Sequence, residues 1–229
     1  MLKSFSRRPL LAIALLTALS VSVIGGCREE TDAMKKANLG RALMERGALE
    51  KSIQTLEESI KLDPELAMSY EALGGAYEAA GNYQKAADAY RNTVIKDPVR
   101  DSAYSSLGCL LLHMGGNEAE AEQVLNKAIE INQTHAGAHA CLGAAYLERR
   151  DYAASIKSSE LAVSLNPQSV QAHLNLGIAF SEIGKIDRAK VEVEKAIQFA
   201  AGNPQVVNRA KMLLESLNHP EMMDRQNHG

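Results

Sequence analysis

Two histidines stand at a spacing that could place both on one helical face and let them share a metal ion. His135 and His139 are four residues apart, and residues at i and i+4 lie one above the other along a helix. Protein zinc sites use three or four side-chain ligands, and no third ligand is apparent beside this pair. We therefore expect no metal site, and nothing in the chain indicates another cofactor.

Cys109 and Cys141 are the other candidates for chemistry. A free thiolate would be a nucleophile, whereas an oxidising compartment would permit a disulfide between the two residues. Packed helix axes lie about 8 to 10 Å apart, and a disulfide needs Cα atoms within about 7 Å. Because the axis separation exceeds the Cα limit, we expect Cys109 and Cys141 to be two small apolar packing residues. A disulfide and a thiol-dependent enzyme are the alternatives.

The start of the chain has the composition of an export signal. Lys3, Arg7 and Arg8 precede an apolar run over residues 9–24. The run is shorter than the ~20 apolar residues that a membrane-spanning helix needs. The sequence therefore predicts a signal peptide over 1–26.

The apolar run ends in Ile24-Gly25-Gly26-Cys27, which resembles the lipobox of bacterial lipoproteins. The resemblance implies that Cys27 is lipidated and becomes the first residue after cleavage. Residues 27–32 would then form a short tether, because five residues after Cys27 span at most about 18 Å. Arg28, in place of the Asp that commonly retains lipoproteins at the inner membrane, implies the outer membrane, facing the periplasm. Cleavage elsewhere, or an uncleaved anchor, is the alternative.

The elements that carry these residues repeat along the chain. A Leu-Gly pair recurs every 34 or 35 residues, at Leu39-Gly40, Leu73-Gly74, Leu107-Gly108, Leu142-Gly143 and Leu176-Gly177. A glycine inside a helix costs about 1 kcal/mol relative to alanine, so a structural gain must offset the loss. Because glycine has no Cβ, we expect it to permit the close approach of one helix to the next.

Other positions repeat with the same period. Counted from Ala33, Ala67, Asp101, Ala136 and Val170, the eleventh residue is large and apolar, and the twentieth is small, with a shift of one in the third unit. This pattern resembles the tetratricopeptide repeat family. The resemblance implies an all-α fold, a right-handed superhelical solenoid with repeats at 33–66, 67–100, 101–135, 136–169 and 170–203. A capping helix over 204–217, preceded by Asn203, and a disordered tail over 218–229 are expected to follow.

Composition excludes several classes of function. The chain holds 25 Lys and Arg against 28 Asp and Glu, and only 4% of its residues are aromatic. An acidic balance argues against nucleic acid, whose phosphates need clustered cations. The sequence shows no phosphate loop, no nucleophile elbow and no paired-cysteine metal motif, and the repeats leave no stretch for a catalytic domain. We therefore expect a protein that is not an enzyme.

The family resemblance implies that a partner peptide or helix lies in a concave groove lined by the first helix of each repeat. The groove positions carried onto this chain are Met44, Glu45, Glu71, Glu78, Ser102, Ser105, Cys109, Leu112, Ala140, Ala144, Glu148, Leu174, Ile178 and Glu182. This lining is small and apolar with Glu toward one edge, which suits an apolar partner segment bearing some Lys or Arg. The alternative is that these Glu are ordinary solvated surface and that the partner sits on the convex side.

These expectations combine into one hypothesis of function. The chain is predicted to be a membrane-anchored adaptor of the bacterial envelope that binds another protein. Known roles of similar lipoproteins imply a pilotin-like factor for pilus or secretion assembly, or a scaffold for cell-wall hydrolases. A self-associating structural array is a further alternative.

Overall fold

The structure, a computed structural model, describes residues 30–116, 118–200 and 202–219. This part of the chain is built from eleven α-helices and contains no strand, so the all-α prediction is confirmed. The predicted signal peptide over 1–26, the predicted lipidation site Cys27 and residues 220–229 of the predicted tail lie outside the described residues.

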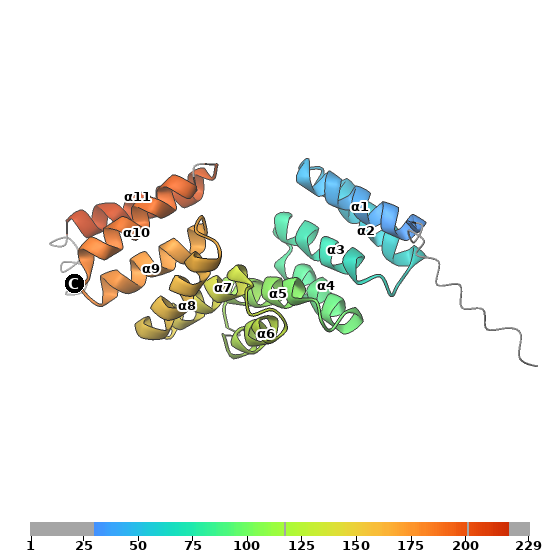
Figure 1. The fold of residues 1–229 in the computed structure, drawn as a ribbon. Coiled ribbons are helices and arrows are strands. Elements are labelled where there is room, and N and C mark those ends of the chain that lie inside the picture. The colour runs from blue at the N-terminus through green and yellow to red at the C-terminus, as the bar shows by residue number, and fades with distance from the viewer. Residues whose placement is uncertain (1–29, 117, 201, 220–229) are drawn as a thin grey trace, which may run out of the picture. The chain divides into compact units, whose positions relative to one another are not determined.

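Ten of the helices form five antiparallel hairpins, and Figure 1 shows the helices following one another in chain order. The pairs are α1 (Asp32–Glu45) with α2 (Leu49–Leu62), α3 (Ala67–Ala79) with α4 (Tyr83–Lys96), α5 (Asp101–Met114) with α6 (Glu118–Ile131), α7 (Ala136–Glu148) with α8 (Tyr152–Leu165), and α9 (Val170–Glu182) with α10 (Ile186–Phe199). The last helix, α11 (Pro204–Asn218), packs on α10. It begins behind Asn203, whose Oδ1 accepts a hydrogen bond from Val206 N at 3.3 Å.

The turn inside each hairpin uses a residue in the left-handed region. Gly47, Gly81 and Gly184 have φ of 75° there, and Arg150 takes the same conformation with φ of 57° in the fourth hairpin. A residue with a side chain adopts this conformation at a cost. Glycine is therefore the less strained choice at these turns.

The recurrent glycine of each Leu-Gly pair lies where the two helices of its hairpin meet. A Cβ built on Gly40 would stand 2.5 Å from Leu56 Cγ, and one on Gly108 would stand 2.5 Å from Leu125 Cγ. The same holds for Gly74, where a Cβ would stand 2.6 Å from Tyr90 Cε1. These distances leave no room for a methyl group, so the close helix approach expected from the glycines is confirmed.

Successive hairpins stack through their first and second helices. The second helix of each hairpin packs on the first helix of the next, and the neighbouring first helices α1 and α3, α5 and α7, and α7 and α9 also contact each other. The contacting helices α3, α7 and α9 carry small residues that are fully buried, at Ser69, Ala138 and Ala172. The first helices α3 and α5 pack less closely than the other neighbours.

The helices are also too short or too polar to lie across a bilayer. Among the described residues, none of them combines the length and the apolar character that a membrane crossing requires.

We predict opposite effects for alanine at the two adjacent glycines of α3. Gly74→Ala should destabilise the protein by about 1 to 3 kcal/mol, because its Cβ would overlap the Tyr90 ring. Gly75→Ala is the matched control, since its Cβ would first meet Met44 Sδ at 3.4 Å. There the gain in helix propensity should leave stability unchanged or raise it by up to about 1 kcal/mol. Urea unfolding measures both, and equal destabilisation by the two variants would contradict this account of Gly74.

Candidate partner-binding surface

The first helices of the hairpins carry the predicted groove residues, and α1 with α3 and α5 with α7 and α9 pack side by side. We call this side of the hairpins the first-helix surface. Apolar side chains on it are half-buried, with no helix of the described residues covering them fully, at Met44, Leu112, Ala144, Leu174 and Ile178. Ser105 and Ala140 are instead buried, with 5% and 3% of their surface exposed. These two contribute to helix packing, and the half-buried residues remain the candidates for contact with a partner.

Glu71 lies at the interface between the second and third hairpins. Arg100, the residue that precedes α5, donates a hydrogen bond from Nη1 to Glu71 Oε2 at 2.9 Å, and Ser102 Oγ donates to Glu71 Oε1 at 2.5 Å. Arg100 Nε also donates to Asp97 Oδ2 at 3.1 Å. These polar side chains connect α3 to the start of α5, where the two helices pack less closely. Sequence reasoning did not single out Arg100, which lies in a turn outside the groove positions.

Two further groove glutamates accept hydrogen bonds from tyrosines. Tyr90 Oη donates to Glu78 Oε2 at 2.9 Å, and Tyr152 Oη donates to Glu182 Oε2 at 2.9 Å. Burial, and then the charge of Glu78, raise the pKa of Tyr90 well above its ordinary value, so this phenol stays protonated and keeps donating. These hydroxyl groups therefore connect α4 to α3 and α8 to α9.

The remaining groove glutamates, Glu45 and Glu148, are exposed. Neither makes a hydrogen bond or ion pair with another side chain in the described part of the chain. Negative charge available to a partner is therefore carried by Glu45, Glu78, Glu148 and Glu182, because a neutral tyrosine hydroxyl does not cancel the charge of the carboxylate to which it donates. The charge of Glu71 is already compensated by Arg100.

A disulfide joins Cys109 of α5 to Cys141 of α7, with the Cα atoms 5.4 Å apart. The expectation that these cysteines are unbonded packing residues is therefore wrong. The error lies in comparing axis separations with a Cα distance, because Cα atoms lie about 2.3 Å from the helix axis. Two facing Cα atoms are thus about 4.6 Å closer than their axes, which brings them within reach of a disulfide.

The disulfide also decides between the alternatives for thiol chemistry. With both sulfurs bonded to each other, neither Cys109 nor Cys141 provides the thiolate that nucleophilic catalysis needs. Both cysteines are half-buried on the first-helix surface, so the bond forms part of the predicted groove floor. It holds α5 and α7 in register there.

The two histidines at metal-ligand spacing have structural partners. His135 precedes α7, and its Nδ1 accepts a hydrogen bond from Ala138 N at 3.2 Å. His139 is buried, and its Nε2 donates to the carbonyl of Gln133 at 2.9 Å. Within residues 30–116, 118–200 and 202–219, no three His, Cys, Asp or Glu side chains are grouped in a way that could hold a metal ion.

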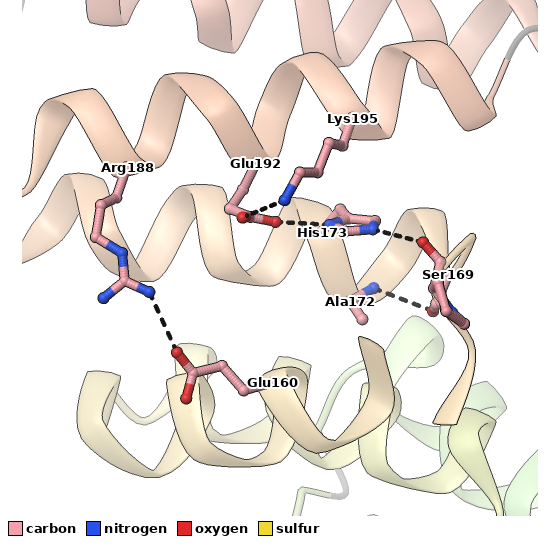
Figure 2. A network of polar contacts seen from close by, with 8 residues as sticks. Glu160, Ser169, Ala172, His173, Arg188, Glu192 and Lys195 are labelled. Carbon is pink, nitrogen blue, oxygen red and sulfur yellow. Dashed lines mark hydrogen bonds and ion pairs between the residues drawn. The ribbon is translucent and has the colours of Figure 1, made fainter. Parts of the chain in front are cut away.

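His173 repeats the role of His139 one hairpin later, because each ring contacts the backbone carbonyl six residues before it. Figure 2 shows His173 between Glu192 and the turn that precedes α9. Its Nε2 donates to the Pro167 carbonyl at 2.9 Å, while Nδ1 lies 2.6 Å from Glu192 Oε2 on α10. Burial alone would raise the pKa of the Glu192 carboxyl, but hydrogen bonds from Lys195 and His173 outweigh it and hold this pKa below its ordinary value. The cluster joins α9 to α10 and to the preceding turn, which is a packing role.

We predict that the disulfide contributes strongly to stability. The bonded residues are 32 apart in sequence, and the chain-entropy model gives about 3 to 4 kcal/mol for a loop of this length. The double variant Cys109→Ser with Cys141→Ser should therefore unfold at lower urea concentration than the oxidised protein. Reductant should shift the wild type toward the variant and leave the variant unchanged. Alkylation of both thiols in the unreduced, unfolded protein would contradict the bond.

Comparisons with known proteins agree with this architecture. The chain matches two family models, one described as TPR repeat at residues 40–81 and one described as Tetratricopeptide repeat at residues 71–136 and 142–204. A curated relative, the peroxisomal targeting signal receptor of Yarrowia lipolytica, is 28% identical over 105 residues, which make up 46% of this chain. The aligned region is 17% of the length of that receptor.

Solved structures share the fold at low sequence identity. MamA from Desulfovibrio magneticus has a TM-score of 0.62 and 22% identity, over 76% of this chain and 99% of that one. A thermophilic TPR protein of Thermus thermophilus has a TM-score of 0.66 and 19% identity, over 80% and 98%. PilW, described as a type IV pilus biogenesis factor, has a TM-score of 0.66 and 17% identity, over 82% and 94%.

Proteins of this fold generally act as non-catalytic scaffolds that bind other proteins. The hairpins, their recurrent glycines and the match of the second family model to more than half of the residues lead to one conclusion. The chain belongs to the tetratricopeptide repeat family.

Proposed function

We propose that this protein is a lipid-anchored adaptor of the bacterial envelope that binds a partner segment on its first-helix surface and catalyses no reaction. The observation that carries the proposal is the disulfide between Cys109 and Cys141, within the surface that the partner would contact. Disulfides persist in exported proteins and are rare in the cytosol. The bond therefore supports a location outside the cytosol, which is also what the predicted export signal and the lipobox ending at Cys27 indicate.

The chemistry of the surface supports the kind of partner. Half-buried apolar side chains such as Leu112, Ala144 and Ile178 provide an apolar strip, and Glu45 and Glu148 remain exposed with unpaired charge in the described region. An extended or helical segment with apolar anchors and Lys or Arg near its ends fits these features. Glu71 is already paired with Arg100 and attracts a basic partner less than its place in the sequence indicates. Glu78 and Glu182 keep their negative charge beside the tyrosine hydroxyls.

A pilotin-like role is the specific form of this function that we infer first. It requires capture of one apolar segment from a membrane-bound subunit, which suits a single apolar strip. The fold of PilW, described as a pilus biogenesis factor, agrees with this role at the level of fold alone. A scaffold for cell-wall hydrolases would instead bind several folded enzymes.

Site-specific photo-crosslinking in cells tests the binding surface. A photoreactive amino acid at Ala144 on α7 should capture the partner, because this residue is half-buried on the apolar strip. The matched control replaces Ala153, an exposed alanine on α8 of the same hairpin. Capture at Ala153 with none at Ala144 would place the partner on the other side of the hairpin. Capture of a single pilus or secretion subunit supports the pilotin-like role. Capture of several cell-wall hydrolases would instead support the role of a hydrolase scaffold.

Fractionation tests the anchor separately. Cys27→Ser should move the protein from the membrane to the soluble fraction, because it removes the thiol that would carry the lipid. The variant Cys109→Ser with Cys141→Ser serves as the control and should stay in the membrane. The lipid-anchor proposal fails if the Cys27→Ser protein remains with the membrane.

A further inference from the structure

Among the described residues, one stripe of α1 lacks the covering that the equivalent stripes have in the other hairpins. At the seventh position of each unit, Leu39 is 53% exposed, whereas its counterparts are between 2% and 7% exposed, at Leu73, Leu107, Leu142 and Leu176. The tenth position shows the same contrast, because Ala42 is half-buried and its counterparts are buried, at Ala76, Leu110, Ala145 and Ala179. In units two to five the preceding hairpin covers these positions. We call Lys35, Leu39, Ala42 and Arg46 the open stripe.

The two ends of the repeat array differ in how they close. At the C-terminal end α11 packs on α10 and buries apolar residues, including Ala210 and Leu217. At the N-terminal end, within the described residues, α1 is the first element. The terminal unit of a repeat array usually has a polar outer face, yet this one keeps Leu39 exposed at its centre.

Basic side chains surround the exposed leucine. At the third position Lys35 is exposed, where the other units have a buried Ser or Ala. Lys36 lies about one helical turn before Leu39, and Arg46 lies about two turns after it. Both therefore lie on the same side of the helix as Leu39. Lys35 pairs with Asp32 and Lys36 with Glu58, while Arg46 has no ion-pair partner among the described residues. The stripe thus has an apolar centre flanked by basic residues, although the chain as a whole holds more acidic than basic residues.

The tether limits what this stripe can reach. Thr31 caps α1, and the four residues from Cys27 to Thr31 span at most about 14 Å. Leu39 lies eight residues further along the helix, a rise of about 12 Å. A lipid on Cys27 would therefore keep the open stripe within a few nanometres of the bilayer, where even a weak contact is favoured by the high effective concentration.

We propose that the open stripe rests on the bilayer surface, with Leu39 at the boundary of headgroups and acyl chains and Lys35 and Arg46 against anionic phospholipid. The proposal rests on the lipid anchor of the proposed function. Apolar side chains flanked by Lys and Arg are the composition of surface-lying helices, whose long cations extend toward the headgroups. The contact would orient the array on the membrane, and the groove would then face a defined direction.

A fluorescent label on Leu39→Cys tests the contact in the full lipidated protein. The natural cysteines are blocked, because Cys27 would carry lipid and Cys109 and Cys141 are bonded to each other, so the new thiol reacts alone. The protein labelled with nitrobenzoxadiazole is reconstituted into vesicles of phosphatidylethanolamine and phosphatidylglycerol. We expect a blue-shifted emission, quenching by nitroxide-labelled lipid and loss of quenching by aqueous iodide. The matched control is Met212→Cys on α11, which is 71% exposed and should show the reverse.

The outcomes separate this inference from the anchor on which it rests. If the protein floats with vesicles but iodide reaches residue 39 as readily as residue 212, the anchor stands and the contact of the open stripe with the bilayer is overturned. If the label at residue 39 is protected from iodide but is not quenched by nitroxide-labelled lipid, then protein, such as a second copy, covers the open stripe. This result would also overturn the proposed contact with the bilayer. A wild-type protein with no lipid in its mass spectrum and no flotation would refute the anchor and the contact together. Lys35→Glu with Arg46→Glu should restore iodide access at residue 39 without loss of flotation.

Discussion

Each hairpin depends on a contact between a glycine of its first helix and one side chain of its second helix. Leu56, Tyr90, Leu125 and Val193 occupy the space that a Cβ would take in four hairpins. The fourth hairpin has Ser159 at this place, and Asn175 of the next hairpin fills the remaining space, with Nδ2 donating to the Ala140 carbonyl at 2.7 Å. Ser159 is shorter than the side chains at this place in the other hairpins, and a polar side chain from the next hairpin fills the space that it leaves.

The stacking of hairpins follows from the same use of small residues. Fully buried Ser or Ala at the third position of units two, four and five accompanies the close contact of each of these first helices with its predecessor. At α5 and α7 this approach brings two cysteines within bonding distance. Between α3 and α5, which pack less closely, the ion pair of Glu71 with Arg100 connects the hairpins. Local packing therefore differs along the array, and the connections between neighbouring hairpins include the covalent bond Cys109–Cys141 and the polar contacts of Glu71 with Arg100 and of Asn175 with Ala140.

The repeat period allowed much of the fold to be predicted. A fixed recurrence of Leu-Gly with small residues at later positions is a one-dimensional pattern, and each unit contacts only its neighbours. The hairpins and the close approach at the recurrent glycines follow from that pattern. The groove could be predicted as a set of positions, but not as a chemical surface. Glu71 is paired by Arg100 from a turn and Glu78 by Tyr90 from the facing helix, and a periodic pattern does not encode such pairings.

The sequence by itself determined the class of fold, its repeating units and the residue types on each helical face, because these depend on spacing along the chain. Only the tertiary structure decided that Cys109 bonds to Cys141, that Ser105 and Ala140 are buried, and that Glu71 is already paired. These outcomes depend on distances of a few ångströms between neighbouring hairpins. The same reason explains Leu39, whose sequence position matches that of four buried leucines and whose exposure depends on the absence of a preceding hairpin among the described residues.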